Sequence, residues 1–425
     1  MTDETVTIDR GGAEGDGIAT AADGATLYVP DVLPGELVQV GRTRRQGNGW
    51  LAPYTALLQA SDARVAPPCT HFGTCGGCVL QHWRDDAYAA WKCDLLRDAL
   101  RRAGFADPSI APLARTAVGQ RRHMDLAAQR TAQGVHVGLH RRSAASVIDL
   151  DECAILHPAL FALLTPLRAL LSRLRALRRD ASIVANLLDH GADLLLRTDA
   201  VLDRGDREPL IAFARTHRLV RLAWATAKGE PEPVVILQPP RITLSGVAVE
   251  LPPGAFLQAS VEGETAIVRA VLAGLPDGLP PRARVAELYA GCGTLTFALA
   301  QHVRVAAWEG DAGAAAAARA AANRSGLAGR VTVTQRDLAR QPVTAAELSG
   351  YAAVVLDPPF AGAAAQTAQI AAAKPPRVIY VSCNPAVLAR DARMLHDAGY
   401  TLLTATPIDQ FLWSARLESV CVFGR

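Results

Sequence analysis

The turn that decides the fold is Glu287-Leu288-Tyr289-Ala290-Gly291-Cys292-Gly293-Thr294, which closes an apolar run that starts at Val285. Its two glycines stand where a backbone leaving a strand must turn sharply and pass close to a ligand. A dinucleotide-binding fingerprint would need a third glycine at position 296, where the sequence has Thr296. A nicotinamide cofactor is therefore disfavoured.

Apolar runs alternate with alanine-rich helical segments around this turn, from about residue 260 onward. The runs are Val285 to Tyr289, Val303 to Trp308, Val331 to Gln335, Ala352 to Leu356 and Val378 to Val381. Strands that alternate with helices predict a doubly wound parallel sheet of the Rossmann-like kind. Such sheets hold their ligands at the carboxyl edge.

Acidic residues follow the strands of this predicted sheet. Glu309 stands 18 residues after Gly291, where a carboxylate can accept hydrogen bonds from both ribose hydroxyls of an adenosine. Asp337 follows the next strand, and Asp357 opens the segment Asp357-Pro358-Pro359-Phe360 after the strand beyond it. Together with the glycine turn, these acids predict a cofactor that contains adenosine.

A cysteine follows the next strand, in Ser382-Cys383-Asn384-Pro385. Asn384 suits the N-cap of a helix, and Pro385 suits its first turn. A thiol at such a position feels the positive end of the helix dipole, which favours the nucleophilic thiolate. A lone cysteine is otherwise most often buried and inert, so it is the surrounding sheet that favours a catalytic Cys383.

The N-terminal half has a different texture. Short β-segments separated by turn glycines predict a small β-barrel over residues 1–60, and residues 61–258 mix helical and strand-like segments. The expected fold class is α/β, with the barrel, a mixed α+β central domain, and the doubly wound Rossmann-like sheet over 259–425. The cysteines Cys69, Cys75, Cys78 and Cys153 form a set that suits zinc or an iron–sulfur cluster, and their spacing leaves the metal open.

Charge and composition limit the possible partners. The 425 residues carry 44 basic and 41 acidic side chains, so the net charge of +3 is too small to drive binding to nucleic acid by itself. Between Arg101 and Ala145, eight arginines stand against two acids, which predicts either a local basic patch or a solvated sheet face. Because no long apolar run or apolar leader occurs, we expect a cytoplasmic protein that does not enter membranes.

Over nearly the full length, these motifs resemble the family of S-adenosylmethionine-dependent RNA 5-methyluridine methyltransferases, in the branch with a TRAM domain and a [4Fe-4S] cluster. Gly15-Asp16-Gly17 and Leu33-Pro34-Gly35-Glu36 resemble the TRAM pattern. The resemblance implies S-adenosylmethionine as cofactor, with contacts from Gln258, Tyr289, Gly291, Gly293, Thr294, Glu309, Asp337 and Asp357. It also implies that Cys69, Cys75, Cys78 and Cys153 hold the [4Fe-4S] cluster.

The same resemblance implies a covalent mechanism. Cys383 would add to carbon 6 of uracil, carbon 5 would take the methyl group, and Glu418 would remove the carbon 5 proton as general base. The target base must leave its stack to reach Cys383. The implied substrate is 23S ribosomal RNA, with transfer RNA as the alternative, and the implied oligomeric state is a monomer.

Some positions depart from the family pattern. The family usually has asparagine, arginine, proline and histidine where this chain has Ser260, Phe360, Leu412 and Arg416. These changes leave both catalytic positions intact but bear on the substrate contacts. Two other functions stay open. One is an amino-methylating nucleic-acid methyltransferase, because Asp357-Pro358-Pro359-Phe360 also resembles the motif of such enzymes. The other is a non-catalytic RNA-binding module.

Overall fold

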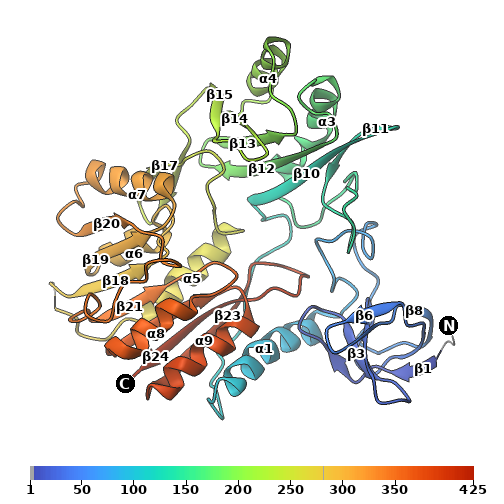
Figure 1. Ribbon diagram of the computed structural model, residues 1–425, viewed down its shortest axis with the longest axis horizontal. Helices are drawn as coiled ribbons and strands as arrows, with labels where there is room; N and C mark the ends of the chain where they lie inside the picture. Colours follow the sequence, from blue (N-terminus) through green and yellow to red (C-terminus); the bar gives the residue numbers. More distant parts are fainter. Residues whose placement is uncertain (1–3, 281) are drawn as a thin grey trace.

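The computed structural model describes residues 4–280 and 282–425 (Figure 1). The N-terminal strands, in blue, gather in a small body, and the central strands, in green, form a separate sheet. The C-terminal strands and helices, in yellow to red, form a larger layered body. No helix among these residues is long and apolar enough to cross a membrane.

Short strands between residues 4 and 59 build the N-terminal body. One sheet has the order β1-β5-β8 and contains Glu4–Thr7, Leu37–Val40 and Tyr54–Gln59. A second sheet has the order β2-β3-β4-β7-β6 and contains Arg10–Gly11, Gly17–Thr20, Thr26–Val29, Gly49–Leu51 and Arg44–Gln46. Alternate residues of these strands, such as Val38 and Val40, point into one shared apolar core because side chains alternate along a strand.

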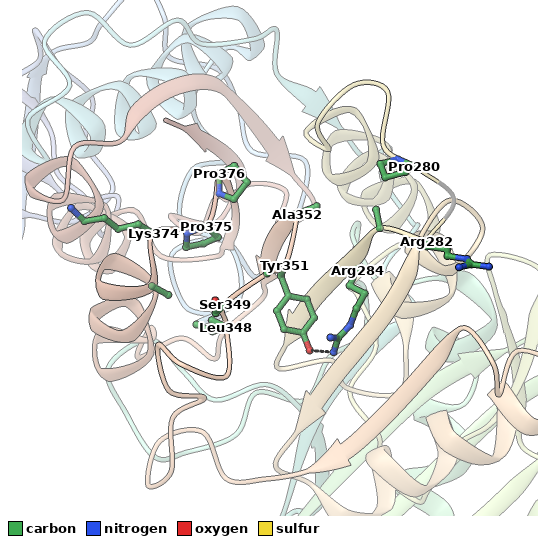
Figure 2. Close-up of a pocket in the computed structure, with 13 residues that line it drawn as sticks. Pro280, Arg282, Arg284, Leu348, Ser349, Tyr351, Ala352, Lys374, Pro375 and Pro376 are labelled. Carbon is green, nitrogen blue, oxygen red and sulfur yellow. Dashed lines mark hydrogen bonds between the residues drawn. The ribbon is translucent and has the colours of Figure 1, made fainter.

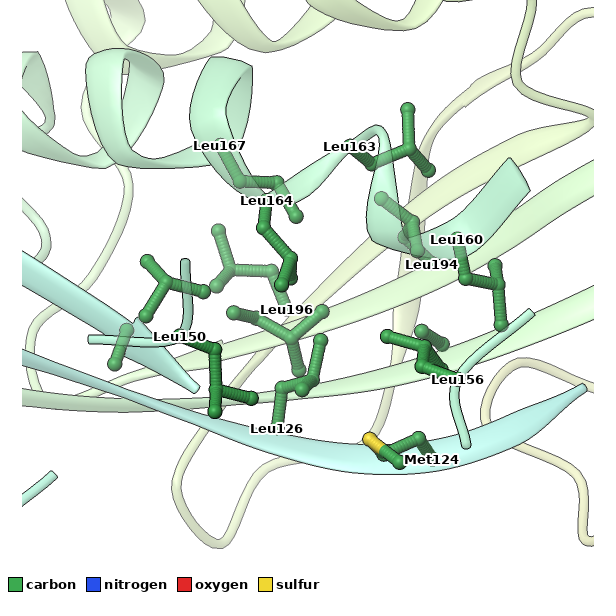
Figure 3. Packing of buried hydrophobic residues seen from close by; sticks show 14 of the residues in the cluster. Met124, Leu126, Leu150, Leu156, Leu160, Leu163, Leu164, Leu167, Leu194 and Leu196 are labelled. Carbon is green, nitrogen blue, oxygen red and sulfur yellow. The ribbon is translucent and has the colours of Figure 1, made fainter. Parts of the chain in front are cut away.

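The central sheet has the order β11-β10-β12-β13-β14-β15. Its strands are Gly134–Gly138, His123–Thr131, Asp180–Leu188, Gly191–Thr198, Arg221–Thr226 and Glu232–Ile236. Helices α2 (Pro158–Phe161), α3 (Leu164–Arg173) and α4 (Arg204–Thr216) accompany it. Leucines at helical spacing bury one face of α3, and Figure 3 shows Leu164 and Leu167 packed over Leu126 of β10 and Leu196 of β13.

The C-terminal sheet has the order β20-β19-β18-β21-β22-β24-β23-β9. Its strands in that order are Val331–Gln335, Arg304–Glu309, Arg284–Leu288, Ala353–Leu356, Arg377–Ser382, Glu418–Gly424, Thr401–Asp409 and Ala114–Arg115. Strands β18 to β22 are parallel, whereas β24 runs antiparallel to both of its neighbours. The predicted doubly wound α/β sheet is confirmed.

Helices cover both faces of this sheet. Val285 of β18 lies in the core with α5 (Val261–Ala273), α6 (Thr294–Ala300) and α7 (Ala312–Arg324), while its neighbour Ala286 lies in the core on the other face. That second core contains residues of α1 (Asp85–Arg102), α8 (Ala364–Ala373) and α9 (Pro385–Asp397). A hairpin of β16 (Arg241–Leu244) and β17 (Val247–Glu250) packs against α7.

Helix α1 joins distant parts of the chain. It follows the cysteine-rich loop in sequence, yet it packs on α9 and β23 at the far end of the chain. Strand β9 then pairs in parallel with β23 before the chain enters the central sheet. The segment from 85 to 115 therefore belongs structurally to the C-terminal sheet, although the sequence grouped it with the central region.

Candidate active site

The glycine loop connects β18 to α6 at the carboxyl edge of the sheet. The backbone angle φ is positive at Tyr289 (64°), Gly291 (57°) and Gly293 (104°). A Cβ atom at Gly293 would lie 2.5 Å from the Phe297 ring, so the turn requires glycine at that position. Thr294 is the first residue of α6, which gives the strand, loop and helix order that the sequence predicts.

Glu309 and Asp337 lie beside this loop. The two carboxylate oxygens of Glu309 accept hydrogen bonds from the backbone N–H groups of Gly291 and Asp311, each at 2.7 Å. This contact holds the acid against the glycine loop and leaves further lone pairs on both oxygens for a diol. Asp337 follows β20 by two residues, and its Oδ1 accepts a hydrogen bond from the N–H of Ala339 at 3.0 Å.

A buried chain of hydrogen bonds connects the glycine-loop side of the sheet to Glu418. Gln258 donates to Asp357 at 3.2 Å, and the side-chain amide of Gln410 donates to Gln258 at 2.8 Å and to Glu418 at 2.9 Å. The side-chain oxygen Oε1 of Gln410 also accepts a hydrogen bond from the backbone N–H of Ala259 at 3.1 Å. Gln410 was not among the predicted site residues, although it stands eight residues before Glu418, the predicted general base.

Burial controls the protonation of the two acids in this chain. It raises the pKa of Asp357 to about 7. It also raises the pKa of Glu418 to about 8, and the nearby Asp357 carboxylate adds to that increase. Oε1 of Glu418 is buried without a hydrogen-bond partner in the part of the chain that the structure describes. A carboxyl group with a pKa near neutrality and one free oxygen is suited to take up a proton.

Cys383 lies between β22 and α9 at the same edge. Asn384 is the N-cap of α9, as predicted, and its side-chain oxygen accepts a hydrogen bond from the N–H of Ala386 at 3.1 Å. The expected activation of the thiol by the helix end is wrong for this state of the protein. Burial, followed by the carboxylates of Glu418 and Asp357, raises the pKa of Cys383 to about 12. The effect of these carboxylates also means that the candidate nucleophile and both acids share one site.

Buried contacts from α1 hold the loop that precedes Glu418. Nζ of Lys92 lies 3.0 Å from Oδ1 of Asp409, and both side chains are fully buried. Oη of Tyr88 donates to Oδ2 of Asp409 at 2.6 Å and accepts a hydrogen bond from the N–H of Trp413 at 2.9 Å. Lys92 also donates to the carbonyl oxygen of Arg416. The loop between β23 and β24 is therefore anchored to a helix more than 300 residues away in sequence.

The positions that depart from the family pattern have distinct roles. Ser260 is the N-cap of α5, where its hydroxyl accepts a hydrogen bond from the N–H of Gly263 at 2.9 Å. Leu412 is buried in the core that contains α3 and the central sheet. The guanidinium carbon of Arg416 lies 4.0 Å from the centroid of the Phe360 ring. Two of these departures thus serve folding, and the other two contact each other near Cys383.

The four predicted metal-binding cysteines line one small hollow. Cys69, Cys75, Cys78 and Cys153 surround it together with Phe72, Leu139 and Leu150. Burial raises the pKa of the Cys78 thiol to about 12. Among the described residues, however, no three His, Cys, Asp or Glu side chains are arranged as ligands of one metal ion. The residues after Cys78 contact the loop between β23 and β24, because the N–H groups of Val79 and Leu80 both donate to the carbonyl oxygen of Trp413.

The predicted basic patch is not a free surface. Arg115, Arg122 and Arg142 pair with carboxylates at 2.6 Å. Arg130 donates to backbone carbonyl groups around the end of α3. Arg121 donates to the carbonyl oxygen of His123 at 3.0 Å. Arg115, Arg122 and Arg142 are therefore neutralised by carboxylates from outside the segment 101–145, so the local excess of positive charge is smaller than the sequence window indicates.

Another hollow, of about 420 Å³, lies away from these groups (Figure 2). Arg284, Tyr351 and Lys374 contribute to its lining, and Arg284 donates to the hydroxyl of Tyr351 at 2.7 Å. This hollow lies at the amino ends of β18 and β21. Doubly wound sheets bind ligands at the opposite edge, so it is not part of the candidate active site.

Comparisons with known proteins agree with this arrangement. A family model described as tRNA (Uracil-5-)-methyltransferase matches residues 280–425. An uncharacterized RNA methyltransferase from Brucella melitensis is 40% identical over 99% of this chain and 97% of its own length. The chain belongs to the S-adenosylmethionine-dependent RNA 5-methyluridine methyltransferase family. The 23S rRNA (uracil(1939)-C(5))-methyltransferase RlmD from Chromohalobacter salexigens is another relative, 35% identical over 100% of this chain and 90% of its own length.

The fold is also shared with a solved structure. The Pyrococcus abyssi tRNA (uracil-54, C5)-methyltransferase, in complex with S-adenosyl-L-homocysteine, matches with a TM-score of 0.73 and 20% identity. The match covers 99% of this chain and 100% of that one, so the likeness extends beyond the C-terminal sheet. The resemblance predicted from the motifs is thus confirmed at the level of the family.

Proposed function

We propose that this protein transfers a methyl group from S-adenosylmethionine to carbon 5 of a specific uridine in 23S ribosomal RNA. One observation carries the proposal: hydrogen bonds join Asp357 through Gln258 and Gln410 to Glu418. Cys383 follows Ser382, which pairs with Ser419 next to Glu418, so the nucleophile candidate lies at the same carboxyl edge of the sheet. The choice of ribosomal RNA follows the relative from Chromohalobacter salexigens, whose name specifies a uracil of 23S rRNA.

Residues along the carboxyl edge would hold the cofactor. Glu309, fixed by its contact with the glycine loop, would accept hydrogen bonds from the ribose hydroxyls. The glycine loop would contact the cofactor through Tyr289, Gly291, Gly293 and Thr294. The remaining proposed contacts come from Asp337, Gln258 and Asp357. When bound, S-adenosylmethionine supplies an electrophilic methyl group. The side chains of this chain then have to make carbon 5 of uracil nucleophilic and remove its proton.

The proposed steps use Cys383 and Glu418. The sulfur of Cys383 forms a bond to carbon 6 of uracil, and the electron pair of the ring double bond moves toward the carbonyl oxygen as an enolate. Carbon 5 then takes the methyl group from the sulfonium, and the electron pair of the broken sulfur–methyl bond stays on the sulfur of the departing thioether. The free oxygen of Glu418 accepts the carbon 5 proton, and the carbon–sulfur bond breaks as the double bond returns. Because Cys383 is a thiol with a raised pKa, it must give up its proton, to water, as its sulfur adds to carbon 6. Glu418 thereby stays ionised for the later step.

A trapping experiment tests this function. The purified protein is incubated with S-adenosylmethionine and 23S ribosomal RNA that contains 5-fluorouridine, since fluorine at carbon 5 cannot leave as a proton. We expect a covalent protein–RNA adduct on a denaturing gel, and none with Cys383→Ala. An adduct with transfer RNA instead would change the substrate and keep the chemistry. Methyl transfer without an adduct would support the amino-methylating alternative, and RNA binding without methyl transfer would support a binding module.

We also propose that the chain represents the branch with a TRAM-like barrel at 1–60, a central domain at 61–258 and a methyltransferase domain at 259–425. Within the central range, the segment from 85 to 115 packs on the sheet of the methyltransferase domain. In this proposal Cys69, Cys75, Cys78 and Cys153 hold a [4Fe-4S] cluster. Four soft thiols around one hollow fit the donor set of such a cluster. Its role would be to tie the loop at 69–78 to Cys153 and, through Val79 and Leu80, to the loop between β23 and β24 at Trp413.

The cluster proposal is tested by chemical analysis and by folding. Protein purified without oxygen should contain iron and acid-labile sulfide in equal amounts, about four of each per chain. Cys75→Ser should lose both and become less soluble. Cys93→Ser is the matched control, because Cys93 lies on α1 outside the hollow. A soluble and active Cys75→Ser protein without iron would overturn the structural role, and zinc in place of iron would overturn the cluster.

A further inference from the structure

Arg416 and Phe360 form an exposed pair at the rim of the candidate active site. The guanidinium carbon lies 4.0 Å from the ring centroid, which is the geometry of a cation–π contact. Phe360 is 47% exposed, and Arg416 is exposed as well. No acceptor for the guanidinium of Arg416 occurs within residues 4–280 and 282–425. Arg122 and Arg142, by contrast, are held by carboxylates.

The backbone around this pair is tied to the groups that carry the chemistry. The side-chain amide of Asn384, the residue after Cys383, donates to the carbonyl oxygen of Phe360 at 3.2 Å. The carbonyl oxygen of Arg416 accepts a hydrogen bond from the buried Lys92, and its N–H donates to the hydroxyl of Ser414 at 3.1 Å. Arg416 stands two residues before Glu418. The free guanidinium is therefore held at a defined place on the rim, near Cys383.

The chemistry of this pair suits a phosphate group. Stacking on Phe360 uses one face of the guanidinium and leaves its edge N–H groups free, and two such donors match two oxygens of a phosphate. Glu418 is buried and Cys383 is half-buried, so a uracil that reaches them must enter the protein. A charged phosphate cannot follow the base into this buried site without a large desolvation cost, so it would stay at the surface, where Arg416 is exposed. The free cation thus lies where the backbone of an everted nucleotide has to pass.

We propose that Arg416, held against Phe360, binds a backbone phosphate of the target nucleotide. This inference rests on the proposed function, because it assumes that an RNA base enters the site beside Cys383. It also accounts for two departures from the family pattern together. These are Phe360 and Arg416, whose side chains contact each other in the structure.

Binding and turnover of Arg416 variants test the proposal. Arg416→Ala should raise the Kd and KM for RNA about tenfold, as expected for one lost charge-assisted contact, and change kcat less than threefold. The slope of log Kd against log salt concentration should become shallower by about 0.7 to 0.9, which corresponds to one phosphate. Arg416→Lys should keep the slope of the wild type and recover part of the affinity. The control is Arg215→Ala, an exposed arginine on α4, which packs on β14 and β15 of the central sheet; this variant should behave as the wild type.

Two outcomes would overturn the inference. One is an Arg416→Ala variant with the salt slope and Kd of the wild type. The other is a loss confined to kcat, which would mean that the guanidinium acts on the base or on Cys383 and not on the backbone. Thermal unfolding of each variant and the recovery by Arg416→Lys separate these results from misfolding. Failure of the proposed function can be distinguished from failure of this inference. In that case the wild-type protein itself would transfer no methyl group to the RNA. The salt dependence of RNA binding could still be compared between the wild type and Arg416→Ala.

Discussion

The buried pair Lys92–Asp409 leads to a sharp prediction about stability. Both side chains are fully buried, and the nitrogen and oxygen atoms are 3.0 Å apart. Asp409→Asn keeps the shape of the side chain and removes the charge that compensates Lys92. Breaking a buried pair by removal of one partner costs about 3 to 5 kcal/mol, because the remaining charge stays in an environment that water does not reach. We expect a loss of that size in the free energy of unfolding of the C-terminal sheet.

The measurement has to isolate this sheet from the other two bodies of the chain. Hydrogen exchange of α1 and β23 peptides across a urea series reports the unfolding of the part that contains the pair. The control is the double variant Lys92→Met with Asp409→Leu, which replaces the pair by apolar side chains and should lie within about 2 kcal/mol of the wild type. A single variant that loses less than about 1 kcal/mol would refute the reasoning, because the charge of Lys92 would then be solvated in some other way.

The single variant should also have its own pH dependence. Burial lowers the pKa of Lys92 in the wild type, and Asp409 opposes this effect. Without the Asp409 charge the folded-state pKa falls further below its unfolded value, so the unfolded chain binds more protons than the folded chain. Stability of Asp409→Asn should therefore rise as the pH increases toward the unfolded pKa of lysine. The double variant has no lysine at this position and should not show the rise.

Other predictions concern the active site. Glu418 must be ionised to take up a proton, and its pKa is raised to about 8, so the rate of methyl transfer should rise with pH through about 8. Glu418→Gln has no carboxylate to take the carbon 5 proton and should accumulate the covalent RNA adduct at every pH. Gln410→Leu removes a hydrogen bond that lowers the pKa of Glu418, so the rise in rate should move to higher pH and the rate at pH 7.5 should fall about tenfold or more. Gly293→Ala places a Cβ against Phe297 at a φ of 104° and should cost about 1 to 3 kcal/mol by thermal unfolding. Gly291→Ala, whose Cβ would meet no atom, should cost less; equal losses would contradict the steric argument.

Local patterns were sufficient for the C-terminal fold. The apolar runs around Val285 and Val378 are buried strands, since a run that is apolar on both faces is stable only between two layers of helices. Asn384 caps α9 because capping depends on residues within one turn. The same locality explains why the glycine loop and Glu309 could be placed together, as each follows directly from the end of its own strand.

The sequence failed where an outcome depended on partners that are distant in the chain. The arginines from 101 to 145 counted as a basic patch, yet Arg142 pairs with Asp16 from the N-terminal body and Arg122 pairs with Glu264 from α5. Gln410 had no predicted role because its contacts, to Gln258 and Glu418, come from separate elements. Net charge in a window of sequence cannot report such pairing, since the carboxylates lie outside that window.

The sequence by itself determined the alternation of strands and helices from Val285 to Val381, the glycine turn, the cap of α9 and the family. These features depend on hydrophobic periodicity and on hydrogen bonds within a few residues. The tertiary structure alone decided the electrostatics of the site. Burial together with two carboxylates raises the pKa of Cys383, whereas the helix position alone predicted a lowered value. The tertiary structure also brought Arg416 against Phe360, which is 56 residues away in sequence. Both outcomes depend on packing, because desolvation and close contact exist only after the distant segments have come together.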